Sequence, residues 1–127
     1  MRWLLAGVLL IHGIAHIVGF VVPWKIIVSS EVPYRTTVLG VDIGKAGIRA
    51  VGLAWLVLAW LFIACAANLT QHEAVAPGRV VALVTGSFLL CALGLPESRP
   101  GLFANAGILA LLAVDWFATS HIFTSMR

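Results

Sequence analysis

Two histidines and one aspartate lie inside long apolar stretches of this sequence. His12 and His16 are four residues apart, so they share one face of a helix, and Asp115 lies in the last apolar stretch. A histidine–carboxylate pair titrates near neutrality and can relay a proton or hold a small polar ligand. The same three side chains also make up a 2-His-1-carboxylate set, which is a pattern that binds metal ions. They are therefore the first candidates for a functional site.

Three hypotheses account for these residues. In the first, they form a structural core, because buried polar groups need partners whatever their role. In the second, they bind a proton or a small ligand. In the third, they hold a metal ion or a haem, although no HExxH motif is present and a second haem ligand would have to come from His121.

The composition indicates a membrane protein. Hydrophobic residues make up 61% of the 127 residues and charged residues only 10%, and the mean hydropathy is +1.06. Soluble domains are about 45–50% apolar and about 25% charged, so an ordinary soluble enzyme is excluded. The eight Lys and Arg residues are spread singly, and no nucleic-acid partner is expected. Cys65 and Cys91 form no CxxC motif, which excludes a zinc ribbon or a thioredoxin-like centre.

Four apolar stretches are long enough, or nearly so, to cross a bilayer, which takes about 20 helical residues. Prolines mark several of their boundaries. The predicted fold is all-α: an integral membrane four-helix bundle with up-down topology and a long first loop, in which residues 1–127 form a single domain. The predicted spans are about 3–22, 47–69, 79–95 and 102–123. Loop 23–46 is extramembrane, and residues 36–43 are predicted to form a small hairpin or an interfacial flap.

Relative depth in the membrane follows from the rise of 1.5 Å per helical residue. Counted from the expected ends of the spans, His12, Asp115, Thr85 and Ser87 share one layer near the side that holds both termini. Five Lys or Arg residues flank the side of loop 23–46 and three flank the other side. This excess favours a cytoplasmic loop and external termini.

A second polar cluster lies between the last two spans. It contains Glu97 and Arg99, with Asn105 one turn into the last helix, and Arg49 of the second span is expected on the same side of the membrane. One interpretation is a turn built from helix-capping residues and prolines. The other is a polar mouth formed together with loop 23–46.

Two segments carry a resemblance to a known family. The stretch Ile11-His12-Gly13-Ile14-Ala15-His16 and the turn Glu97-Ser98-Arg99-Pro100-Gly101 followed by Asn105 resemble an uncharacterised family of small bacterial four-helix integral membrane proteins. Its members look alike in an HG-x-x-H in the first helix and an acidic-x-basic-x-Gly-x-x-x-Asn turn into the fourth. The resemblance implies a four-helix fold in the inner membrane, supports these polar residues as a site and implies no activity. A looser similarity is to DoxX-like proteins of redox complexes, although the lack of paired cysteines argues against thiol–quinone chemistry.

The sequence thus predicts a multi-pass protein of the bacterial plasma membrane that contacts lipids and belongs to a homo-oligomer or a larger membrane complex. The leading hypothesis is a non-enzymatic accessory or ligand-binding subunit with a buried layer formed by His12, His16, Asp115 and Ser87. The alternatives are a small transporter or channel coupled to protons or ions, and a redox protein that binds a metal ion or haem. No catalytic residue is predicted, and the sequence identifies no cofactor.

Overall fold

The computed structural model describes residues 2–28, 30–71 and 75–124, and the side chains of this part as far as residue 117. The described chain is largely helical, which confirms the all-α prediction. After Ile17, whose backbone is itself helical, α2 continues from α1, so the two helices form one apolar segment. The helices are α1 (Arg2–His16), α2 (Val18–Val21), α3 (Gly44–Thr70), α4 (Pro77–Leu93) and α5 (Arg99–Thr124).

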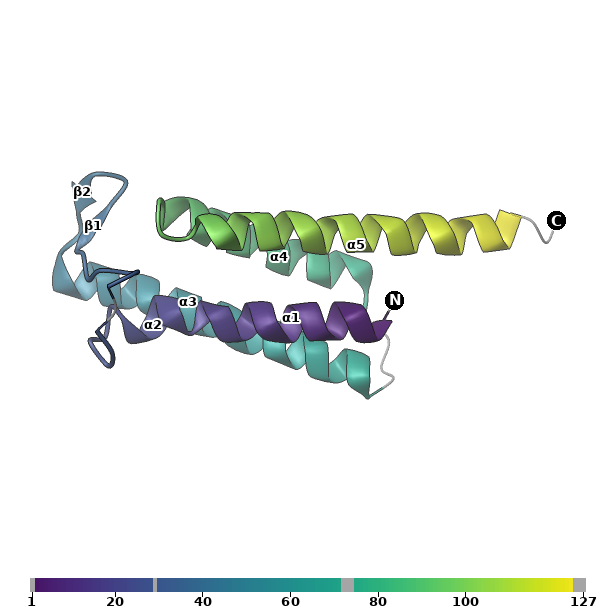
Figure 1. Ribbon diagram of the computed structural model, residues 1–127, viewed down its shortest axis with the longest axis horizontal. Helices are drawn as coiled ribbons and strands as arrows, with labels where there is room; N and C mark the ends of the chain where they lie inside the picture. Colours follow the sequence, from purple (N-terminus) through teal and green to yellow (C-terminus); the bar gives the residue numbers. More distant parts are fainter. Residues whose placement is uncertain (1, 29, 72–74, 125–127) are drawn as a thin grey trace.

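The helices run up and down in a bundle (Figure 1). The most extensive contacts are those of α1 with α3 and of α4 with α5, and contacts of α3 with α4 and of α1 with α5 close the bundle. The start of α1 and the end of α5 lie at the same end of the molecule, and α5 extends well beyond the start of α1. Three segments are long and apolar enough to cross a membrane, namely Arg2–Val21, α3 and Arg99–Phe117 of α5, whereas α4 is a shorter apolar helix.

Local chemistry explains where the helices begin. Asp42 precedes α3, and its Oδ1 accepts a hydrogen bond from the backbone N–H of Gly44 at 2.9 Å. This bond, together with one from the Thr36 side chain, holds the pKa of Asp42 below its usual value. Pro77 opens α4 and Pro100 lies in the first turn of α5, where a missing backbone N–H costs nothing because no intrahelical partner exists there.

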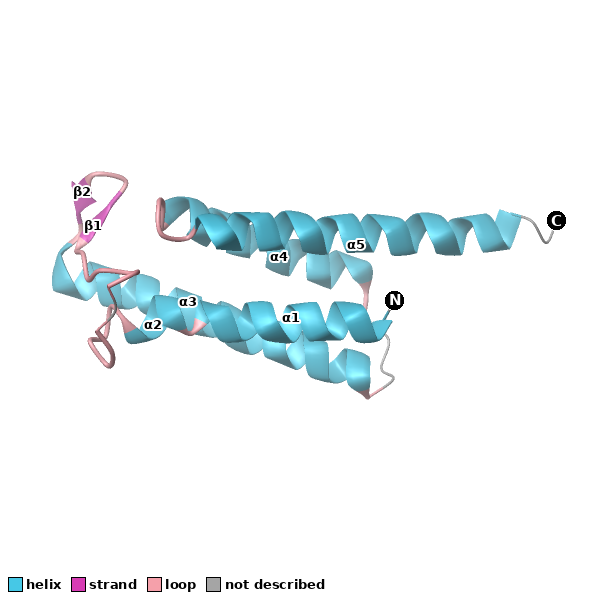
Figure 2. Ribbon diagram, viewed as in Figure 1, coloured by secondary structure: helices cyan, strands magenta, loops and turns pink. Residues whose placement is uncertain are grey.

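A small hairpin lies in the loop between α2 and α3 (Figure 2), as predicted for residues 36–43. Strands β1 (Thr37–Val38) and β2 (Val41–Asp42) pair antiparallel. The two residues between them, Leu39 and Gly40, have φ values of 49° and 81°. Two successive positive φ values are typical of a type I′ turn, whose twist matches that of a two-residue hairpin.

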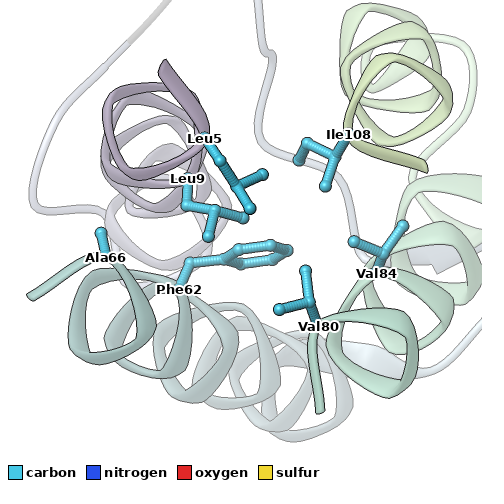
Figure 3. Close-up of a cluster of buried hydrophobic side chains, with 7 residues drawn as sticks. All are labelled: Leu5, Leu9, Phe62, Ala66, Val80, Val84 and Ile108. Atoms are coloured by element: carbon cyan, nitrogen blue, oxygen red, sulfur yellow. The ribbon is translucent and has the colours of Figure 1, made fainter. Parts of the chain in front are cut away.

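The apolar core lies toward the end of the bundle where α1 begins (Figure 3). Side chains from four helices meet there: Leu5, Leu9, Phe62, Ala66, Val80, Val84 and Ile108. Next to this cluster, α1 approaches α3 closely at Gly13. A Cβ atom at this position would lie 3.0 Å from both the carbonyl oxygen of Ala59 and the Cβ of Phe62. The close crossing of the two helices therefore requires glycine at position 13.

We expect Gly13→Ala to lower the free energy of unfolding by about 1–3 kcal/mol, because backbone atoms of α3 would have to move apart from α1. Gly7→Ala is the matched control on the same helix, since a Cβ there meets nothing within 4 Å. Thermal unfolding in detergent compares the two variants. Equal stabilities would contradict the close approach at Gly13.

Candidate functional site

Four buried polar side chains from three helices meet directly beside the apolar core. His12 and His16 come from α1, Ser87 from α4 and Asn105 from α5. The Ser87 Oγ lies 2.8 Å from Nε2 of His16 and 2.9 Å from Nδ2 of Asn105. Nε2 of His12 lies 2.9 Å from Oδ1 of Asn105 and 3.2 Å from the same Ser87 Oγ. The network of these four side chains links the two helical hairpins of the bundle.

The acceptors fix the direction of each hydrogen bond. Nδ1 of His16 lies 2.8 Å from the carbonyl oxygen of His12, which only accepts, so Nδ1 carries the proton. In a neutral imidazole Nε2 of His16 then accepts, and the Ser87 hydroxyl donates to it. Similarly, Nε2–H of His12 donates to the amide oxygen of Asn105, whose NH₂ group donates to Ser87 Oγ. The network is therefore satisfied when both histidines are neutral.

Aromatic rings surround the two imidazoles. The ring of His12 stands edge-on to Phe62, with centroids 4.9 Å apart, and the ring of His16 lies 5.0 Å from Trp55. Gly19 lets Trp55 approach α2, because a Cβ there would come within 2.4 Å of the indole ring. These apolar neighbours make an added charge in the network costly.

Asn105 belongs to this network and not to the turn at the membrane face, so its predicted position is wrong. Its side chain is 0% exposed. The reason lies in the period of α5, where Gly101, Asn105, Ile108 and Leu112 follow at helical spacing, and Ile108 is part of the apolar core. That spacing of apolar and small residues is the sequence signal that could have placed Asn105 inside.

Asp115 does not share a layer with His12, and the predicted pairing of the two is wrong. Asp115 is exposed and lines a separate cavity of about 230 Å³ beside Arg2 and Leu5. Ten residues separate it from Asn105, which corresponds to about 15 Å along α5. The predicted layer requires every helix to start at the membrane surface, whereas α5 is shifted along its axis past the start of α1.

The remaining candidates are also placed by the structure. Without Asp115 the candidate metal set is lost, and the described residues contain no group of three or more His, Cys, Asp or Glu side chains that could hold a metal ion. Thr85, predicted in the same layer, is exposed and donates to the carbonyl oxygen of Val81. The side chain of His121 lies outside the described part of the chain.

A cavity of about 570 Å³ begins at the histidines and leads away from the apolar core. Its walls come from α1, α2, the loop before the hairpin, the start of α3 and the turn between α4 and α5. Most lining side chains are apolar, including Val8, Val18, Val22, Ile48 and Val51, while His12, His16, Trp55 and Cys91 line its inner part. Its extent along α1 and α2 from Val8 to Val22 is about 20 Å. Ile11 lines the cavity and is 70% exposed, so the cavity opens sideways between α1 and α5.

An ion pair crosses the outer end of this cavity. Nη2 of Arg35, from the loop, lies 3.1 Å from Oε1 of Glu97 in the turn between α4 and α5, and both residues line the cavity. Glu97 therefore pairs with the loop, whereas Arg99 opens α5 with an exposed side chain. Arg49 lies over the Trp24 ring at 5.3 Å and does not line the cavity.

Sequence reasoning missed Arg35, Trp55 and Cys91 as cavity residues. Arg35 is an ordinary loop residue by sequence, and only the fold brings it to Glu97. Trp55 lines the cavity and packs against the ring of His16. Comparison of the chain with protein-family models, with curated proteins and with solved structures finds no match.

Ser87→Ala should lower the free energy of unfolding by about 1–3 kcal/mol, because it leaves Nε2 of His16 and the Asn105 amide without their buried partner. Thr85→Ala is the matched control on the same helix, and its effect should stay within about 0.5 kcal/mol. Unfolding by denaturing detergent measures both. If Ser87→Ala and Thr85→Ala lower the free energy of unfolding equally, the network does not join the helices as described.

Proposed function

We propose that this chain is a non-enzymatic, ligand-binding protein of the bacterial plasma membrane, which takes a small and largely apolar molecule into the cavity beside His12 and His16. The observation that carries the proposal is the cavity of about 570 Å³, apolar along its walls and polar at its inner end. Binding sites for small molecules are typically 300–1,000 Å³ and combine apolar walls with a few placed polar groups. A role as an accessory subunit of a larger complex or of a homo-oligomer is part of the same proposal.

The membrane placement rests on length, composition and surface. Three segments are long and apolar enough to cross a bilayer, and α4 is apolar but shorter. Large apolar side chains point outward from the helices, among them Trp60, Phe103, Trp116 and Phe117. Such surfaces fit contact with lipid chains or with other membrane helices. The sideways opening of the cavity between α1 and α5 then faces the bilayer, from which an apolar molecule can enter.

A transport role is less well supported. A proton relay through His12, His16 and a carboxylate would need Asp115 beside the histidines, and Asp115 lines the other cavity. The resemblance to a small bacterial membrane family and to DoxX-like proteins stays a prediction, and the proposal of ligand binding does not depend on it.

Binding can be measured by quenching of Trp55, which lines the cavity. We expect 2-bromododecan-1-ol, whose bromine lies next to the hydroxyl group, to quench a variant that keeps only Trp55 in a saturable way, because bromine quenches indole fluorescence on contact. A variant that keeps only the outward-facing Trp60 of the same helix should show quenching that rises in proportion to added probe. Ala104→Phe, which fills the cavity, should abolish the saturable component, and Ala106→Phe, exposed on the same helix, should preserve it.

Identical, non-saturable quenching of Trp55 and Trp60 would contradict a binding cavity. So would saturable quenching that Ala104→Phe leaves unchanged. The melting temperature of each variant shows whether the fold is intact and separates loss of binding from loss of structure.

The four-span arrangement predicts opposite signals from two reporter fusions. A reporter after Arg127 lies on the side of the termini, and one inserted within loop 23–46 lies on the other side. The excess of positive charge near the loop favours a cytoplasmic loop. Matching signals from the two positions would contradict four spans, and opposite signals with an external loop would contradict only the orientation.

A further inference from the structure

The polar groups at the inner end of the cavity differ in what they can still offer a ligand. Every strong donor of the network already donates a hydrogen bond within it. The Ser87 hydroxyl donates to Nε2 of His16, and Nδ1–H of His16 donates to the carbonyl oxygen of His12. Nε2–H of His12 donates to the amide oxygen of Asn105. The amide NH₂ of Asn105 donates to Ser87 and contacts the sulfur of Cys91 at 3.8 Å. The hydroxyl of Ser98 donates to the carbonyl oxygen of Cys91.

One strong acceptor is left. With its proton on Nε2, neutral His12 carries a lone pair on Nδ1, and within the described part of the chain no hydrogen bond reaches that atom. Among the described residues, Nη2 of Arg2 is the one buried side-chain nitrogen or oxygen that lacks a partner. Nδ1 of His12 is therefore not fully buried, and His12 is one of the residues that line the cavity.

The other residues at the inner end of the cavity further restrict the class of molecule that can bind there. No charged side chain among the described lining residues lies there, because Arg35 and Glu97 are paired at the outer end. An ion would lose its hydration without compensation, which excludes a charged head group. The indole N–H of Trp55 has no acceptor among the described residues and is suited to donate to an oxygen atom.

From these contacts we propose that the cavity selects a neutral, elongated amphiphile that ends in a hydroxyl group. The hydroxyl donates its proton to Nδ1 of His12, while its oxygen remains free to accept. The hydrocarbon part extends from His12 along Val18 and Val22 toward the outer end of the cavity. A ligand of the same shape that ends in an ether or carbonyl oxygen can accept a hydrogen bond but cannot donate one. It therefore leaves Nδ1 of His12 desolvated and unpaired. This inference rests on the proposed ligand-binding function and specifies its ligand class.

The test compares dodecan-1-ol with 1-methoxydodecane as competitors for 2-bromododecan-1-ol in the variant that keeps only Trp55. The two competitors share one hydrocarbon chain and differ in the ability to donate. We expect the alcohol to restore fluorescence at about tenfold lower concentration than the ether, which is the effect of one acceptor left without its partner. Equal competition by both molecules would overturn the hydroxyl specificity while leaving the binding function intact. Failure of both to compete, with no saturable quenching, would overturn the binding function itself.

A second measurement locates the hydrogen bond without any substitution in the network. In ¹⁵N-histidine-labelled protein, dodecan-1-ol should shift the Nδ1 resonance of His12 and leave Nε2 of His16 in place, because His16 already accepts from Ser87. The methyl ether should shift neither. An alcohol that competes without moving the His12 resonance would show that the hydroxyl binds elsewhere in the cavity.

Discussion

The relative position of three helices depends on the hydroxyl group of Ser87 in α4. It accepts from Asn105 of α5, donates to His16 of α1 and lies 3.2 Å from Nε2 of His12. In an apolar environment no water replaces a lost partner, so each of these groups is costly to leave unpaired. Any sliding of α5 along α1 by one turn would separate Asn105 from His12 and leave both buried without partners. The network thereby sets the axial position of the α4–α5 hairpin against the α1–α3 hairpin.

The polar network separates two different regions along the axis of the bundle. On one side of the network the four helices meet in the core of Leu5, Leu9, Phe62 and their neighbours. On the other side the small residues Gly94, Gly101 and Ala104 face the apolar side chains of α1 and α2 across open volume. The loop and the Arg35–Glu97 pair then close the outer end. Core, polar layer, cavity and ion pair follow one another, so a ligand in the cavity contacts the polar layer at one end and the loop at the other.

The sequence was sufficient for those features that depend on local pattern. The helices begin and end within a few residues of the predicted spans, since hydropathy and proline positions act locally, and the hairpin around Leu39 and Gly40 has a local turn signal. The site was predicted only in part. His12, His16 and Ser87 are brought together. Asn105 was predicted at the turn with Glu97, and Asp115 was predicted beside His12, because the axial shift of α5 depends on contacts between helices. The pairing of Arg35 with Glu97 arises in the same way from the path of a loop that carries no periodic pattern.

The orientation of the hydrogen bonds also determines how a proton behaves in this layer. A proton taken up at Nδ1 of His12 can pass from Nε2 through the Ser87 oxygen to Nε2 of His16. It goes no further, because the other nitrogen of His16 donates to the backbone carbonyl of His12, and a peptide oxygen does not hand a proton on. The amide oxygen of Asn105, which accepts from Nε2–H of His12, does not pass a proton on either. Within the described residues, the hydrogen-bonded path that starts at His12 therefore ends at Nε2 of His16.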